Sequence, residues 1–211
     1  MLWSMRLRPP ASNPAYSMEK QILIDSRPDL VVTKWCGLKQ TALLARDERA
    51  AQRFPEHFLR TARSFDTMLS TEEDKKTALT AGISEDEWLE LGSGGILAGL
   101  WILCERLHAG MRVNLKDIPL RQETIELANY FDRNPYEMNA LGCLLIAAAD
   151  GGRLARVMQQ NGIEARVIGC LQSGRRRELI NGEEIRYLDM PRQTLREMGL
   201  WNGKERMPQQ K

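Results

Sequence analysis

The stretch with the clearest chemical content is Gly92-Ser93-Gly94-Gly95, which directly precedes an apolar helical pattern. Glycines let a backbone approach a phosphate closely, and the N–H groups at the start of a helix carry the positive end of its dipole. The hydroxyl of Ser93 could add a further donor. These residues could bind a phosphate, or the glycines could serve only a tight strand-to-helix turn that needs their backbone freedom.

Charged residues near this stretch are further candidates. Glu85, Asp86, Glu87 and Glu90 could hold Mg²⁺ through one or two carboxylates, although a run of charge is more often a solvated surface. Lys34, in an expected strand, could face a phosphate or could be an ordinary solvent-side residue. The sequence leaves both alternatives open.

The sequence gives little support for a metal site or for nucleophilic catalysis. The four cysteines are widely spaced without a CxxC pair, and the chain has only two histidines, so no zinc-ligand pattern is present. Cys104 and Cys143 lie in apolar runs, where cysteine behaves as a small buried hydrophobe. His108 comes at an expected helix end, where a cation is favourable. We therefore expect no metal site and assign no catalytic residue.

The elements that must position these residues follow from hydrophobic periodicity and turn signals. The patterns predict strands over 29–35, 111–115, 165–171, 177–180 and 184–188, and helices over 41–51, 55–69, 71–81, 95–108, 121–131, 151–160 and 191–198. The nearly all-apolar run 141–149 is typical of a central strand covered on both faces. In the helix over 121–131, Ile125, Leu127 and Ala128 are expected to face inward. Asn181-Gly182 predicts a two-residue hairpin turn.

Strands interspersed with helices predict a layered α/β (α+β) domain, a mixed sheet packed with helices. We expect an irregular extension over 1–27, this domain over 28–190, and a short helix with a frayed tail over 191–211. Hydrophobic residues make up 43% of the chain and its net charge is +2, which allows a core and does not favour nucleic acid. The cluster Arg175-Arg176-Arg177 is expected to be a solvated turn. No apolar run reaches the length of a membrane span and no secretory signal is present, so the expected location is cytoplasmic.

Four features in order resemble the C-terminal domain of the AIR synthase superfamily. They are VVTKWCGLKQTALLAR at 31–46, GSGGILAGLW at 92–101, the long stretch at 113–148 with its NPYE block, and the closing VIG…NGEE strands. That superfamily includes aminoimidazole ribonucleotide synthetase, selenophosphate synthetase, thiamine-monophosphate kinase and a hydrogenase maturation factor. The resemblance covers about residues 28–190 and is nearest to the branch labelled hydrogenase maturation-like.

The resemblance implies the fold of an ATP-dependent synthetase or kinase. It also implies that Gly92, Ser93, Gly94, Gly95, Glu90 and Lys34 lie at a phosphate or nucleotide site. Glu90 could stand in for an acidic residue of the family's pattern, whereas Leu89 cannot replace its histidine. In the family an N-terminal domain holds Mg-ATP and forms the dimer sheet, and only about 27 residues precede the domain here. We therefore expect Mg-ATP only if a separately encoded N-terminal ATP-binding half is supplied, and no activity from the chain alone.

Two alternatives to this phosphate-binding role remain. The chain could be a truncated, non-catalytic remnant, and the irregular start before the domain is the observation that favours this alternative. It could also be an oligomerising binding module, because a face that a partner domain normally covers can be buried in a homo-oligomer. Neither the substrate nor the reaction follows from the sequence.

Overall fold

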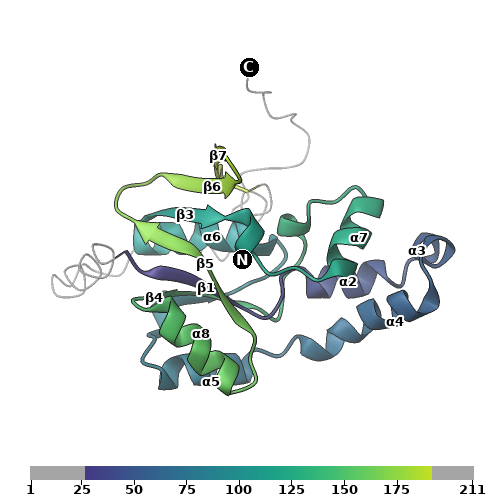
Figure 1. Ribbon diagram of the computed structural model, residues 1–211, viewed down its shortest axis with the longest axis horizontal. Helices are drawn as coiled ribbons and strands as arrows, with labels where there is room; N and C mark the ends of the chain where they lie inside the picture. Colours follow the sequence, from purple (N-terminus) through teal and green to yellow (C-terminus); the bar gives the residue numbers. More distant parts are fainter. Residues whose placement is uncertain (1–26, 192–211) are drawn as a thin grey trace, which may run out of the picture.

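The computed structural model describes residues 27–191, which form a seven-stranded mixed sheet with helices on both faces (Figure 1). The strand order is β2-β4-β1-β5-β3-β6-β7. The strands are β1 (Asp29–Thr33), β2 (Trp88–Glu90), β3 (Gly110–Asn114), β4 (Leu144–Ala148), β5 (Ala165–Gln172), β6 (Arg177–Asn181) and β7 (Glu184–Tyr187). Neighbouring strands are antiparallel, except that β3 and β6 are parallel. The predicted α/β class is confirmed.

Seven α-helices connect these strands. They are α2 (Leu38–Leu44), α3 (Glu48–Arg53), α4 (Glu56–Ser64), α5 (Glu72–Thr80), α6 (Gly95–Leu107), α7 (Gln122–Tyr130) and α8 (Gly151–Gln160). Short 3-10 turns are η1 (Phe65–Met68), η2 (Glu85–Glu87), η3 (Leu115–Asp117) and η4 (Pro135–Glu137). No helix within residues 27–191 is long and apolar enough to cross a membrane.

The core has two layers because side chains alternate across the central strands. In β4 every residue is buried: Leu145 and Ala147 pack in the cluster that contains α6, whereas Leu144, Ile146 and Ala148 pack on the opposite face with α8. Figure 1 shows α5 and α8 together on that second side, and α2, α3, α4 and α7 gathered beyond one end of the sheet. The cover on both faces predicted for this strand is confirmed, but the strand spans only Leu144–Ala148 and lies second in the sheet order, beside the edge strand β2.

Some local predictions needed correction. The helix expected over 41–51 is two helices, because the chain turns at 45–47 and the Asp47 side chain caps α3 by accepting from the backbone N–H of Arg49 at 2.9 Å. Ile125 is 36% exposed, and Thr124 takes an inward position beside Leu127 and Ala128. Leu127 and Ala128 are buried as predicted, and only Ile125 was wrongly placed, because tertiary packing covers Thr124 in its stead.

The closing hairpin is confirmed with a one-residue shift. Asn181 still pairs with Glu184 in the sheet, so the two loop residues are Gly182 and Glu183. Gly182 has φ +66, which favours glycine at the first loop position. The prediction for Arg177 was wrong: this side chain is buried, stacked on Trp101 and paired with Glu105, whereas Arg175 and Arg176 are exposed as expected. The extension before residue 27 and the helix predicted over 191–198 lie outside the described residues.

Candidate functional site

The segment 134–143 brings together the motif stretches that the sequence singled out. Its Ala140 N–H donates to the carbonyl of Gly92 at 3.1 Å, and its Asn139 carbonyl accepts from the Gln40 N–H at 3.4 Å. The carbonyl of Gly142 accepts from the Lys34 ammonium at 3.3 Å. The end of β1, the glycine-rich loop 92–95 and the segment that leads into β4 therefore meet at one junction, which we take as the candidate site.

The glycine-rich loop is held tightly on one side. Gly95 has φ +67, and a Cβ there would lie 2.4 Å from the Tyr136 carbonyl oxygen and 2.8 Å from the Cα of Glu137. Glycine at 95 is thus required by the backbone conformation and by the close approach of η4. The loop is open on its other side, because Gly92 and Ser93 are exposed and nothing lies within 4 Å of a Cβ placed on Gly92. Any ligand of this loop would approach there.

Tyr136 and Asn134 shape the turn that covers this loop. The Asn134 carboxamide oxygen accepts from the backbone N–H of Tyr136 at 3.1 Å, and the Tyr136 hydroxyl donates to the Leu115 carbonyl at 3.1 Å. Burial raises the pKa of Tyr136, with a smaller contribution from the Cys36 thiol. These two hydrogen bonds hold the η4 turn in place beside the loop.

Glu90 ends β2 and is tied to the start of α5. Thr71 Oγ1 donates to Glu90 Oε1 at 2.8 Å, and the Lys75 ammonium lies 3.0 Å from Glu90 Oε2. Burial raises the pKa of Glu90, but the hydrogen bonds from Lys75 and Thr71 and the charges of Lys75 and Lys34 outweigh it, so the net pKa is lowered. Glu90 is therefore an ionised, hydrogen-bonded carboxylate.

The rest of the acidic run is not gathered around a cation. The Glu87 carboxylate accepts from the backbone N–H of Ser84 at 2.7 Å as part of a capping box. Within the described part of the chain, no group of three or more His, Cys, Asp or Glu side chains is placed to hold a metal ion.

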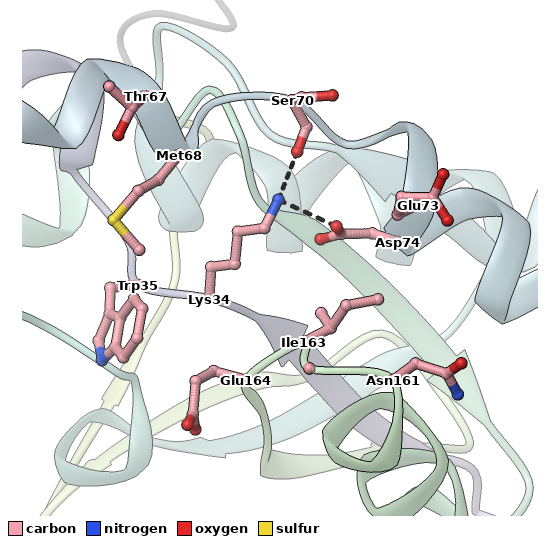
Figure 2. A pocket seen from close by; sticks show the side chains of 11 residues that line it. Lys34, Trp35, Thr67, Met68, Ser70, Glu73, Asp74, Asn161, Ile163 and Glu164 are labelled. Atoms are coloured by element: carbon pink, nitrogen blue, oxygen red, sulfur yellow. Dashed lines mark hydrogen bonds and ion pairs between the residues drawn. The ribbon is translucent and has the colours of Figure 1, made fainter.

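Lys34 follows β1 with φ 56, a left-handed conformation that is uncommon for a residue other than glycine. Its ammonium lies 2.9 Å from Asp74 Oδ1 and donates to the carbonyl of Ser70 (Figure 2). It also donates to the carbonyl of Gly142. These three acceptors match the three N–H donors of a lysine. Lys34 thus joins β1, the start of α5 and the loop before β4.

Asp74 is the buried partner in this network. It is 2% exposed, and its Oδ2 accepts from Thr33 Oγ1 at 2.7 Å. The Thr33 oxygen in turn accepts from the backbone N–H of Leu144 at 2.9 Å. Sequence reasoning missed Asp74, because nothing in the first turn of α5 distinguishes it from the neighbouring acids Glu72 and Glu73.

Lys34 also lines a cavity of about 570 Å³ between the end of β1, η1, the start of α5 and the turn after α8 (Figure 2). Its walls are Lys34, Trp35, Thr67, Met68, Ser70, Glu73, Asp74, Asn161, Gly162, Ile163 and Glu164. None of the loop residues 92–95 is among them. The predicted site residues therefore form two neighbouring groups, the loop and the Lys34 network, with Glu90 bound to the same helix start as Lys34.

A second feature of the junction was also missed. The guanidinium carbon of Arg121 lies 3.6 Å from the centroid of the Trp35 ring. Both residues belong to stretches that carry the family resemblance, yet no spacing rule links positions so far apart in the chain.

No family model and no curated protein sequence matches the chain. Solved structures do. HypE from E. coli, a hydrogenase maturation protein, superposes with a TM-score of 0.63 at 14% identity over 77% of this chain and 49% of that one. HypE in complex with ATP gives 0.58 at 13% identity over 82% and 54%. Thiamine-monophosphate kinase from Stenotrophomonas maltophilia K279a gives 0.55 at 18% identity over 77% and 54%.

The chain spans about half the length of these solved proteins. At such identities the likeness concerns the fold, and it agrees with the fold that the motif stretches implied. This chain thus shares its fold with about half of HypE and of thiamine-monophosphate kinase.

Proposed function

We propose that this domain is one half of an ATP-dependent protein of small-molecule or hydrogenase-maturation type. In this proposal it contributes a phosphate-contacting surface at the loop 92–95, and a second, ATP-holding half supplies the remainder of the Mg-ATP site. The observation that carries the proposal is the fold, shared over about half of their length with a HypE solved with ATP and a thiamine-monophosphate kinase solved with AMPPCP and TMP.

The geometry of the loop supports this division of labour. One side of the loop is closed by η4, while Gly92 and Ser93 face outward at the start of the 13-residue helix α6. Helix starts of this kind favour anions. Lys34 and Glu90 act in the proposal as supports: their charges are matched by Asp74 and Lys75, so they hold the junction in place and leave phosphate contact to the loop.

The proposal is tested by placing a bulky residue on the open side of the loop. Gly92→Val should leave the fold intact, because open space surrounds that position, but it should weaken Mg-ATP binding by the chain combined with an ATP-holding half. Glu126→Gln, on the exposed surface of α7, is a matched control and should bind as the wild type does. Equal Mg-ATP affinity for Gly92→Val and the wild type would show that the loop does not contact the nucleotide.

A further inference from the structure

We propose that the guanidinium of Arg121, stacked on the indole of Trp35, binds the oxyanion of a small ligand, a phosphate or a carboxylate. Neither Arg121 nor Trp35 belongs to the loop 92–95. This site goes beyond the proposed function, because it needs no ATP-holding half.

The stack is held in a defined place. Arg121 is the N-cap residue of α7, and just before it the Pro119 carbonyl accepts from the Cys36 N–H at 2.9 Å. A Cβ on Gly37 would lie 2.9 Å from Thr124 Cγ2, so α7 packs directly against the loop that carries Trp35. At 3.6 Å from the ring centroid, the guanidinium lies on the face of the indole, and its N–H edge is left for an acceptor.

That acceptor is absent from the part of the chain that is described. Arg121 Nε is buried without a hydrogen-bond partner, and the guanidinium forms no ion pair with any residue of 27–191. Glu123, two residues further on, does not come within ion-pair distance of it. A guanidinium carries five N–H donors, and donors that are withdrawn from water without an acceptor destabilise the protein.

The same fold contains a second stack that serves as a comparison. Arg177 lies with its guanidinium carbon 3.7 Å from the Trp101 ring centroid, and its Nε is likewise buried without a partner. Its terminal N–H, however, donates to the carboxylate of Glu105. The two stacks are alike in geometry and differ in their anion. Arg177 has the carboxylate of Glu105, whereas Arg121 has no carboxylate partner among the described residues.

The chemistry of the missing partner follows from this comparison. The two terminal nitrogens of an arginine match the two oxygens of a carboxylate or a phosphate, and such charge-assisted pairs are among the strongest hydrogen bonds. Arg121 is partly exposed, so a ligand can reach these terminal nitrogens while Nε stays covered. An oxyanion bound there forms with Arg121 the ion pair that the Glu105 carboxylate forms with Arg177.

The test is an NMR titration of the full ¹⁵N-labelled chain with sodium phosphate and, separately, with sodium acetate, each against sodium chloride of equal ionic strength. We expect saturable shifts of the Trp35 indole N–H and the Arg121 side-chain N–H resonances with the oxyanion and none with chloride. A response to phosphate alone identifies a phosphate site, and a response to both identifies a general oxyanion site. Absence of a saturable response to either overturns the proposal.

Variants separate this site from general charge effects. Arg121→Gln should weaken the affinity for the responding anion by about tenfold or more, the loss expected for a charge-assisted pair. Arg112→Gln makes the same change of charge at a side chain that is 53% exposed, and it should leave the affinity unchanged. Equal binding by Arg121→Gln and wild type would contradict the proposal.

If Arg121→Gln does not fold, the anion affinity of Trp35→Leu tests the proposal instead. Loss of the indole ring should also weaken anion binding, and an unchanged affinity would contradict the site. The outcome is independent of the nucleotide proposal. Inorganic phosphate can bind at Arg121 whether or not the chain mixed with an ATP-holding half binds Mg-ATP. Each of the two proposals can therefore be contradicted while the other stands.

Discussion

The ammonium of Lys34 lies 2.9 Å from Oδ1 of Asp74, a carboxylate that is only 2% exposed. The pair joins residues 40 positions apart and fixes the end of β1 against the start of α5. It also accounts for a lysine in a left-handed conformation, since that backbone geometry directs the side chain toward Asp74, Ser70 and Gly142. The pair therefore holds the Lys34 side of the candidate site in place.

Replacing Asp74 with asparagine should therefore destabilise the fold. The substitution leaves the Lys34 ammonium, whose side chain is 14% exposed, without its anion at a buried position, which costs about 3 kcal/mol of unfolding free energy. Urea unfolding of Asp74→Asn and wild type measures the difference. Asp66→Asn is the control: it breaks partly exposed pairs with Arg46 and Lys39 and should cost about 0.5 kcal/mol. Equal losses for both variants would show that the Lys34–Asp74 pair has no special weight.

The backbone conformation of Lys34 gives a second prediction. Lys34→Gly and Lys34→Ala both remove the ion pair, so the difference between them reports the cost of φ 56 for a residue with a Cβ. Glycine should be the more stable variant by about 0.5–1 kcal/mol, in spite of the greater freedom of its unfolded chain. Denaturant midpoints at equal slopes provide the measurement, and a more stable alanine variant would contradict the strained conformation.

The closed side of the glycine-rich loop can be tested by stability alone. Gly95→Ala places a Cβ 2.4 Å from the Tyr136 carbonyl oxygen in a positive-φ conformation and should cost about 3 kcal/mol or more. Gly92→Ala meets open space and should change stability by less than about 0.5 kcal/mol. Thermal and urea unfolding distinguish the two, and a tolerated Gly95→Ala would mean that η4 does not pack against this loop as described.

Glu90 gives a prediction about pH. Burial raises its pKa, but the hydrogen bonds from Lys75 and Thr71 and the nearby cations lower it below its ordinary value of 4.5. The ionised form therefore stabilises the fold, and this contribution is complete above pH 4.5 and is lost as the pH falls through the lower value of the folded state.

We thus expect wild type to be more stable than Glu90→Gln at neutral pH, and the advantage to shrink as the pH falls below 4.5. The effect should be small, because the Glu90 side chain is 36% exposed and water screens the charge. Urea unfolding at neutral and acidic pH compares the two proteins. A difference that stays constant or grows on acidification would contradict this role of Glu90.

Much of the fold could be predicted because its signals are local. The apolar run before Asp150, the helical patterns over 71–81 and 151–160, and the closing glycine turn each carry their own pattern, and each forms the expected element. The errors arose where packing decides. Ile125 fits an inward stripe by periodicity, but α7 turns Thr124 toward Gly37 and Thr41 instead.

The site was less predictable because it is assembled from distant residues. Lys34 and Glu90 were identified, but their partners Asp74 and Lys75 lie in a helix whose first turn is uniformly acidic. The stacking of Arg121 on Trp35 joins positions 86 residues apart. Only the three-dimensional arrangement shows which charges are matched and which guanidinium has no ion-pair partner among residues 27–191.

Calorimetric titration with Mg-ATP is the most direct test of the central claim that this domain is one half of an ATP-dependent protein. Two titrations are needed, one of the chain alone and one of the chain mixed with an equal amount of an ATP-holding half. We predict no saturable binding, or only weak binding, to the chain alone, and clear saturable binding to the mixture that exceeds the binding by the ATP-holding half alone. If this domain adds nothing to the affinity of the other half, the account is contradicted.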